Sequence, residues 1–235
     1  MNDSPIIIAL DVPSADEARR LVREIGDAAS FYKVGLELYA AAGPDFAREL
    51  KAEGHRVFLD LKLHDIGETV RRTVAQVTKI GPDFLTVHAT DQGMRAAVEG
   101  RGTSSDSPLK LLGVGVLTSL DDSDLEKDGY SRSLTDLVEL RTRSAMAAEM
   151  DGIVCSPREV AKVRAITGPK MILLNPGVRS AGSETGDQKR VATPAEAVAA
   201  GADYIVIGRQ VTRAKDPRGE TLRILEEVGA VAKAG

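Results

Sequence analysis

The chain has 235 residues and a net charge of −4, with 43% hydrophobic residues, 3% aromatic residues and no tryptophan. Few aromatic side chains and an acidic balance exclude a general nucleic-acid-binding surface, which relies on basic residues and on rings that stack on bases. No apolar run approaches the length of a membrane span, and the N-terminal MNDSPIIIALDV lacks the basic start of a signal peptide. A single cysteine, Cys155, excludes an intrachain disulfide. We therefore predict a protein of the reducing cytoplasm with neither nucleic acid nor a membrane as partner.

Short aliphatic and β-branched runs alternate with helical patterns along the whole chain. The predicted strands occupy residues 6–10, 31–34, 57–61, 83–87, 109–116, 152–155, 171–174 and 204–207. The predicted helices occupy residues 14–26, 36–53, 67–80, 91–99, 133–149, 157–167, 194–200 and 217–233. Because parallel strands need long crossover connections, which are usually helices, this alternation predicts a parallel sheet.

The number of strand–helix units decides between two α/β folds. Eight units in a chain of this length are typical of a (β/α)8 TIM barrel, here a single domain over residues 1–235. A doubly wound open sheet is the alternative. That fold uses about six strands and usually has a glycine-rich turn after the first strand, whereas ALDVPS in this chain contains no glycine. We therefore expect the barrel.

One long polar loop, residues 175–190 (NPGVRSAGSETGDQKR), interrupts the alternation. Loops of this length without secondary structure are uncommon in compact domains and are often functional. We predict a mobile loop that closes over the barrel mouth and grips a phosphate. The alternative is an ordinary solvated insertion.

Polar side chains stand where the predicted strands end, whereas the strand bodies are aliphatic. Active sites of (β/α)8 barrels lie at this end of the sheet, in the loops that follow the strands. In chain order the residues at these strand ends are Asp11, Lys33, Asp60, Lys62, His88, Thr118, Ser119, Cys155, Asn175, Gly208 and Arg209. The pattern predicts one polar mouth.

The segment FLDLKLHDIGETV (58–70) places three charged residues on and after the third predicted strand. Asp60 and Lys62 are two positions apart, so on a strand both side chains project to one side, toward the barrel axis. Lys33 ends the neighbouring strand, which predicts a Lys–Asp–Lys array with Asp65 in the following loop. Because unpaired buried ions are costly, such an array is either a structural ion network or a functional site, and its place at the mouth favours function.

An anion site is predicted after the eighth strand, which ends VIGRQ. Gly208 lets the backbone approach a ligand closely, and Arg209 offers a forked cation. Barrels often bind phosphate after strands 7 and 8. Arg179 and Gln188 of the long loop would complete the site.

Taken together, the strand ends resemble the bacterial type of the orotidine 5'-monophosphate decarboxylase family. The resemblance lies in ALDV, YKVG, DLKLHDI, VLTS, VCSP, NPGVR and VIGR and spans nearly the whole chain. Three places depart from the family pattern: Gly67 replaces a usual proline, Asn175 replaces a common threonine, and ATDQGMR (89–95) has less glycine than relatives have. None of them changes a charged position, so they bear on local loop shape.

The resemblance implies cofactor-independent decarboxylation of orotidine 5'-monophosphate to uridine 5'-monophosphate, a carboxy-lyase reaction and the last step of de novo pyrimidine synthesis, without a metal. It implies a homodimer in which Asp65 and Thr69 reach into the partner's site. Lys62 would protonate C6 of the pyrimidine, Asp60 would stress the departing carboxylate, and Lys33 and Asp65 would hold the array. The substrate-binding residues would be Asp11, Lys33 and Thr69 at the ribose, Thr118 and Ser119 at the pyrimidine, and Arg179, Gln188, Gly208 and Arg209 at the phosphate.

Two alternatives stay open. The D-x-K-x-x-D core also occurs in relatives that act on sugar phosphates, in which Asp60 and Asp65 would ligate Mg²⁺ and stabilise an enediolate. The second alternative is a barrel without activity that binds nucleotides or phosphates. No nucleotide-cofactor fingerprint and no histidine-rich metal cluster occurs in the sequence.

Overall fold

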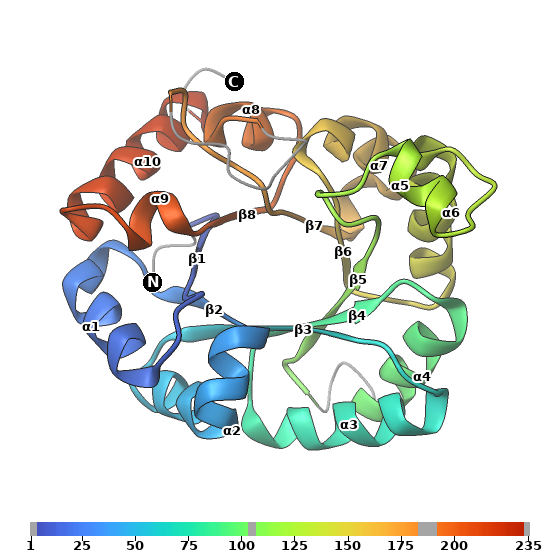
Figure 1. Ribbon diagram of the computed structural model, residues 1–235, viewed down its shortest axis with the longest axis horizontal. Coiled ribbons are helices and arrows are strands. Elements are labelled where there is room, and N and C mark those ends of the chain that lie inside the picture. The colour runs from blue at the N-terminus through green and yellow to red at the C-terminus, as the bar shows by residue number, and fades with distance from the viewer. Residues whose placement is uncertain (1–3, 103–106, 183–191, 233–235) are drawn as a thin grey trace.

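The computed structural model describes residues 4–102, 107–182 and 192–232. Its eight strands are parallel and close into a barrel in which each strand pairs with its neighbours in chain order and β8 pairs with β1. Figure 1 shows the barrel end-on, with the helices in a ring outside the strands. The strands are β1 (Ile6–Ala9), β2 (Phe31–Gly35), β3 (Arg56–Leu63), β4 (Phe84–His88), β5 (Lys110–Val114), β6 (Gly152–Val154), β7 (Ile172–Asn175) and β8 (Tyr204–Ile207).

At least one helix follows each strand in the chain, and the helices cover the outside of the sheet. They are α1 (Ala15–Ile25), α2 (Leu36–Ala52), α3 (Gly67–Ile80), α4 (Asp91–Arg101), α5 (Asp122–Lys127), α6 (Leu134–Ala147), α7 (Val160–Thr167), α8 (Pro194–Ala199), α9 (Arg209–Thr212) and α10 (Pro217–Ala232). The predicted (β/α)8 barrel is therefore confirmed, and the open-sheet alternative is wrong.

Differences from the predicted elements are local. The third strand extends past the predicted 57–61, because it bends near its end and pairs with β4 again at Leu63. The fifth strand ends at Val114, short of the predicted 109–116. The helices α5 and α9 were not predicted, since six and four residues are too few for a clear helical period.

Helix starts follow the local signals in the sequence. The hydroxyl of Ser14 accepts a hydrogen bond from the backbone N–H of Glu17 at the start of α1. At the start of α8, Thr193 and Glu196 form a reciprocal capping box, with Pro194 in the first turn. Each such cap contributes about 1 kcal/mol, so these helices begin where the sequence alone predicts.

Apolar side chains fill two layers, as alternation along the strands requires. The larger layer lies between the sheet and the helices. The smaller layer consists of Ile7, Ala9, Phe31, Phe58, Phe84, Leu112, Leu174 and Val206 and fills the barrel interior. Below it, the guanidinium of Arg56 lies 4.1 Å from the ring centroid of Phe31 and 5.3 Å from that of Tyr204. Since these three residues begin their strands, the amino end of the barrel is closed and the carboxyl end carries the mouth.

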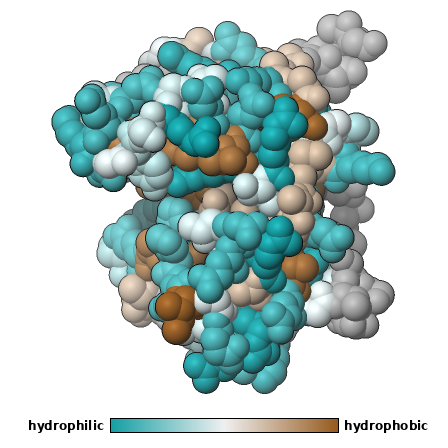
Figure 2. Space-filling model, turned by 90° about the vertical axis from the view of Figure 1, so that its right-hand side faces the viewer, coloured by the Kyte–Doolittle hydropathy of each residue, from teal (hydrophilic) through white to brown (hydrophobic). Residues whose placement is uncertain are grey.

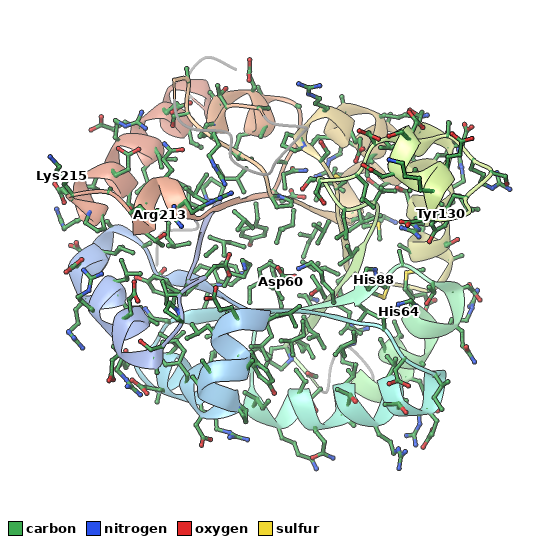
Figure 3. The ribbon with its side chains drawn as sticks, viewed as in Figure 1. Asp60, His64, His88, Tyr130, Arg213 and Lys215 are labelled. Carbon is green, nitrogen blue, oxygen red and sulfur yellow. The ribbon has the colours of Figure 1, made fainter. Side chains whose placement is uncertain are left out.

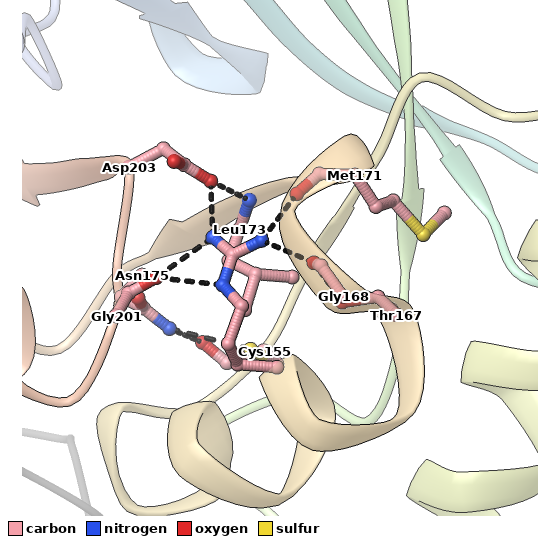
Figure 4. A network of polar contacts seen from close by, with 9 residues as sticks. Cys155, Thr167, Gly168, Met171, Leu173, Asn175, Gly201 and Asp203 are labelled. Carbon is pink, nitrogen blue, oxygen red and sulfur yellow. Dashed lines mark hydrogen bonds and ion pairs between the residues drawn. The ribbon is translucent and has the colours of Figure 1, made fainter.

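Three aspartates fasten the closed end by the same hydrogen-bonding pattern. Asp83, Asp151 and Asp203 precede β4, β6 and β8, and each accepts a backbone N–H from the preceding odd-numbered strand. Each carboxylate also pairs with basic side chains: Lys51 at Asp83, Arg101 and Lys110 at Asp151, and Arg164 at Asp203. Figure 4 shows the contacts around Asp203. These pairs fix the strand starts in register at the end opposite the mouth.

The outer surface is mostly polar. Figure 2, which faces the right-hand side of Figure 1, shows small separate hydrophobic patches and a hollow between the upper and lower parts of this face. Three exposed apolar side chains, Leu36, Ile66 and Leu117, stand just after β2, β3 and β5, at the mouth end of the barrel. Within the described ranges, each helix is too short or too polar to cross a bilayer.

Candidate active site

A cavity of about 410 Å³ opens at the carboxyl ends of the strands. Sites for small molecules usually enclose roughly 300–1,000 Å³, so the cavity has room for a ligand of nucleotide size. Phe58 of the inner layer contributes to its lining. The charged and hydroxyl-bearing residues that line it are Asp11, Lys33, Glu37, Asp60, Lys62, Thr118, Ser119 and Arg179.

The carboxylate of Asp60 lies between two lysine ammonium groups. Lys62 Nζ is 2.8 Å from Asp60 Oδ2, and Lys33 Nζ is 3.6 Å from the same oxygen. Lys33 Nζ is also 2.7 Å from Asp11 Oδ1. Figure 3 shows Asp60 on the inner side of the barrel wall. The structure therefore brings the predicted Lys–Asp–Lys array together and adds Asp11 at one end.

The lysine charges keep Asp60 ionised despite its burial. Only 14% of the Asp60 side chain is exposed, and burial by itself raises the pKa of a carboxyl group. The charges of Lys33 and Lys62, with hydrogen bonds from Lys62 and Thr86, outweigh this effect and lower the pKa of Asp60 below its ordinary value. The cavity thus contains a fixed negative charge at neutral pH.

The end of β3 is irregular where it carries these charges. Leu59 pairs with Leu85 of β4 and Leu63 pairs with Val87, so three residues of β3 oppose one residue of β4. Within this bulge Lys62 has φ 47°, a left-handed conformation that costs a non-glycine residue roughly 1–3 kcal/mol. A regular strand was predicted here, and that detail is wrong: a bulge brings the ammonium onto the carboxylate.

The register between β2 and β3 also differs from the expected one. Lys33 lies opposite Phe58, and Gly35 lies opposite Asp60. A Cβ atom on Gly35 would stand 2.6 Å from Asp11 Oδ1 and 2.8 Å from Lys33 Nζ. The absence of a side chain at position 35 therefore makes room for the Asp11–Lys33 ion pair.

Most of the predicted binding residues surround the same cavity. Asp11, Thr118, Ser119, Arg179 and Gly208 all contribute to its lining. They come from the ends of β1, β5, β7 and β8, so they lie around the mouth rather than on one side of it.

Three predicted residues lie outside the cavity lining. Asp65 is exposed, and its carboxylate accepts a hydrogen bond from the backbone N–H of Ile66 at 2.7 Å. Thr69 lies in the first turn of α3, and Arg209 begins α9 directly after Gly208. In this chain Asp65 and Thr69 therefore do not meet the Lys–Asp–Lys array.

The predicted phosphate-gripping loop is described in part. Val178 and Ala192 form a parallel β-bridge, and the backbone N–H of Arg179 donates to the carbonyl of Ala192 at 3.0 Å. The two described ends of the loop are thus joined beside the cavity. Gln188 lies outside the described residues.

Two residues near the array were missed by the sequence analysis. Glu37, in the first turn of α2, lines the cavity. Thr86 of β4 is fully buried, and its hydroxyl lies 3.0 Å from Asp60 Oδ1. Neither carries a distinctive signal, because a glutamate in a first helical turn and a threonine in a strand are both common.

A histidine pair lies beside the array. The ring centroids of His64 and His88 are 5.1 Å apart, and Figure 3 shows the two residues side by side. Burial lowers the pKa of His88, and the neighbouring His64, Arg141 and Lys62 lower it further. The His88 imidazole is therefore neutral at neutral pH and adds no positive charge next to Lys62.

Two of the departures from the family pattern lie outside the cavity. A Cβ atom on Gly67 would stand 3.4 Å from Gln92 Cγ of α4, an ordinary van der Waals distance, so the packing of α3 on α4 does not require a glycine there. Asn175 is fully buried and donates from Nδ2 to the carbonyl oxygen of Cys155 at 2.7 Å, as Figure 4 shows. Neither residue lines the cavity.

Comparison with known proteins finds matches along nearly the whole chain. The family model described as "Orotidine 5'-phosphate decarboxylase / HUMPS family" matches residues 4–224. An orotidine 5'-phosphate decarboxylase of Rhodopseudomonas palustris (strain HaA2) is 52% identical, over 95% of this chain and 94% of the relative. One of Methylobacterium nodulans is 51% identical, over 98% of this chain and all of the relative.

A solved structure has the same fold. The crystal structure of orotidine 5'-phosphate decarboxylase from Lactobacillus acidophilus matches with a TM-score of 0.84 and 33% sequence identity, covering 96% of this chain and 99% of the other. Both the family model and relatives above half identity span the residues that form the cavity. The chain belongs to the orotidine 5'-phosphate decarboxylase / HUMPS family.

Proposed function

We propose that this protein converts orotidine 5'-monophosphate to uridine 5'-monophosphate and CO₂, the last step of de novo pyrimidine synthesis, and that it acts in the cytoplasm. The observation that carries the proposal is the Asp60 carboxylate held between the Lys33 and Lys62 ammonium groups in a cavity of nucleotide size. The whole-length relatives named orotidine 5'-phosphate decarboxylase support the same activity.

The reaction breaks the bond between C6 of the pyrimidine and its carboxylate carbon. The electron pair stays on C6, neutral CO₂ leaves, and a proton must then bond to C6. Lys62 would stabilise the developing negative charge with its ammonium group and donate that proton. Its amine takes a new proton from water, so charge and atoms balance without an oxidant or reductant.

Asp60 would lie beside the substrate carboxylate. Two unit charges ~4 Å apart repel by about 4 kcal/mol at an effective dielectric constant of about 20. This repulsion ends when CO₂ leaves as a neutral molecule, so it raises the energy of the bound substrate relative to the transition state. Lys33, held by Asp11 and Asp60, would keep the carboxylates in place.

The remaining lining residues would bind the other parts of the nucleotide. Asp11 and Lys33, which line the cavity, would bind ribose hydroxyls, and Thr118 and Ser119, which line it after β5, would contact the pyrimidine. The phosphate would lie at Gly208, with Arg179, Arg209 and Gln188 around it. Binding energy gained at the phosphate would help to hold C6 against Lys62.

The array does not suit a divalent cation. Two ammonium groups already flank Asp60, and a bound Mg²⁺ would be repelled by both. Asp65 of the same chain lies outside the cavity, so the sugar-phosphate alternative would need its second carboxylate from another chain. The two ammonium groups beside Asp60 therefore support chemistry by the lysines themselves.

We further propose that the protein is a homodimer in which Asp65 and Thr69 complete the partner's site. In one chain these residues lie outside the cavity, at its mouth end. Ile66, next to Asp65, is 68% exposed, and Leu36 at the cavity rim is 59% exposed. Covering these apolar side chains with a second copy would remove them from water and carry Asp65 toward the other array.

The assay that tests the proposed function follows the absorbance of the orotate ring as it is lost. We expect steady turnover of orotidine 5'-monophosphate and no change after EDTA treatment. Loss of turnover with EDTA, restored by Mg²⁺, would favour the metal-dependent alternative. No turnover under either condition would favour a barrel that only binds nucleotides.

Gly35→Ala tests the ion pair beside Asp60. The added methyl would displace the flexible ends of Asp11 and Lys33 without straining the backbone, because position 35 has φ −90°. We expect a normal fold and kcat/KM lower by about 10- to 100-fold, since a displacement of about 1 Å at a reacting site has effects of this size. Gly229→Ala on α10, where a Cβ meets nothing within 4 Å, is the matched control. Equal kinetics for the two variants would contradict the role of the pair.

A further inference from the structure

We propose that Thr86 is a positioning residue for this reaction: its hydroxyl ties the Asp60 carboxylate and the Lys62 backbone to one point of β4 and so fixes the ammonium beside the carboxylate. The inference rests on the proposed function for its kinetic test. Its geometric basis is independent of the substrate.

Three hydrogen bonds form a closed ring through these residues. The Thr86 hydroxyl donates to Asp60 Oδ1 at 3.0 Å and accepts from the backbone N–H of Lys62 at 2.9 Å. Lys62 Nζ donates to the other carboxylate oxygen, Asp60 Oδ2, at 2.8 Å, which closes the ring. A hydroxyl has one donor and two acceptor positions, so a single group serves both neighbours. Thr86 is fully buried, so water does not compete for these bonds.

The bulge in β3 explains why a hydroxyl is needed at this position. Thr86 lies between Leu85 and Val87, the two residues of β4 that pair with β3 on either side of the bulge. Residues 60–62 are therefore out of the regular ladder, and a backbone N–H there needs another partner. The Thr86 hydroxyl supplies it to Lys62, the residue with φ 47°. An apolar side chain at position 86 would leave the Lys62 amide and the Asp60 carboxylate each without this hydrogen-bond partner.

Removal of the hydroxyl also has a predictable effect on ionisation. The charged and titratable groups around Asp60 are Lys33 from β2, Lys62 on its own strand and His88 from β4, with Asp11 beyond Lys33. The hydrogen bond from Thr86 lowers the pKa of Asp60. Activity that requires charged Asp60 is lost as the pH falls through that pKa. Loss of the bond raises the pKa, so the acidic limb of the pH–rate profile moves to higher pH.

The experiment compares Thr86→Val, which keeps the shape and removes the hydroxyl, with Thr86→Ser, which keeps the hydroxyl. For Thr86→Val we expect kcat to fall by about 10- to 100-fold with little change in KM, because the misplaced groups act in the transition state. The acidic limb of kcat should move to higher pH. Thr86→Ser should keep both kcat and the acidic limb of the pH profile close to those of wild type. Thr221→Val is the matched control, since Thr221 is also fully buried but donates to the Pro217 carbonyl within α10.

A folded Thr86→Val enzyme with wild-type kcat and pH profile would overturn the inference, as would a Thr86→Ser enzyme as impaired as Thr86→Val. If Thr86→Val fails to fold, a crystal structure of the wild-type protein decides: a Thr86 hydroxyl that contacts neither Asp60 nor the Lys62 amide overturns the inference, and one that contacts both supports it. If the wild-type protein does not decarboxylate the nucleotide, the proposed function fails. The hydrogen bond can still be tested, because NMR titration should show a higher pKa of Asp60 in Thr86→Val than in wild type.

Discussion

Lys62→Ala is expected to lower turnover of orotidine 5'-monophosphate by at least about 10⁴-fold, since one change removes both the proton donor and the charge that faces the developing anion. The fold should survive, because the Lys62 side chain is 30% exposed and lies at the cavity mouth. Asp60 keeps Lys33 as its second cation. Single-turnover kinetics, with circular dichroism to confirm folding, measure the effect.

The chain offers a matched control for this change. Lys110 also pairs with a largely buried aspartate, Asp151, at 3.1 Å, but it does so at the closed end of the barrel. Lys110→Ala should therefore keep its kcat within a few-fold of wild type. If Lys62→Ala retained a tenth of wild-type turnover, Lys62 would not be the proton donor.

Mixing two inactive variants is expected to restore activity if Asp65 acts across a dimer interface. In a mixed dimer of Lys62→Ala and Asp65→Ala, one site combines both defects and the other has Lys62 from one chain and Asp65 from its partner. With free exchange of subunits at equal amounts, about a quarter of all sites regain the complete set of residues. Turnover should rise from near zero toward that fraction, followed by absorbance as the subunits exchange.

The control mixture pairs Lys62→Ala with Asp60→Ala. Both residues belong to β3 and to the same cavity, so each site of the mixed dimer keeps one defect and no recovery is expected. Differently tagged chains show whether mixed dimers have formed. Mixed dimers of Lys62→Ala and Asp65→Ala that stay inactive would place Asp65 outside the partner's site.

Local signals in the sequence are enough to predict the barrel fold. Eight aliphatic runs, each followed by a helical period, predict a parallel sheet covered by helices. Each helix can bury its apolar face on the sheet as long as its apolar residues recur with the helical period. Caps such as Ser14 and Thr193 mark helix starts by contacts within four residues. The aspartates before β4, β6 and β8 are also visible in the sequence, in PDF, MDG and ADY, although their shared hydrogen bonds were recognised only in the structure.

The sequence by itself also determined that Lys33, Asp60 and Lys62 meet at one mouth, because strand ends of a parallel barrel lie at the same edge. Only the tertiary structure decided how they meet. Gly35 rather than Lys33 lies opposite Asp60, Lys62 takes a left-handed conformation, and Thr86 bonds to both neighbours. These features depend on the register between strands that are distant in sequence and on a bulge, and no periodicity within one strand encodes either.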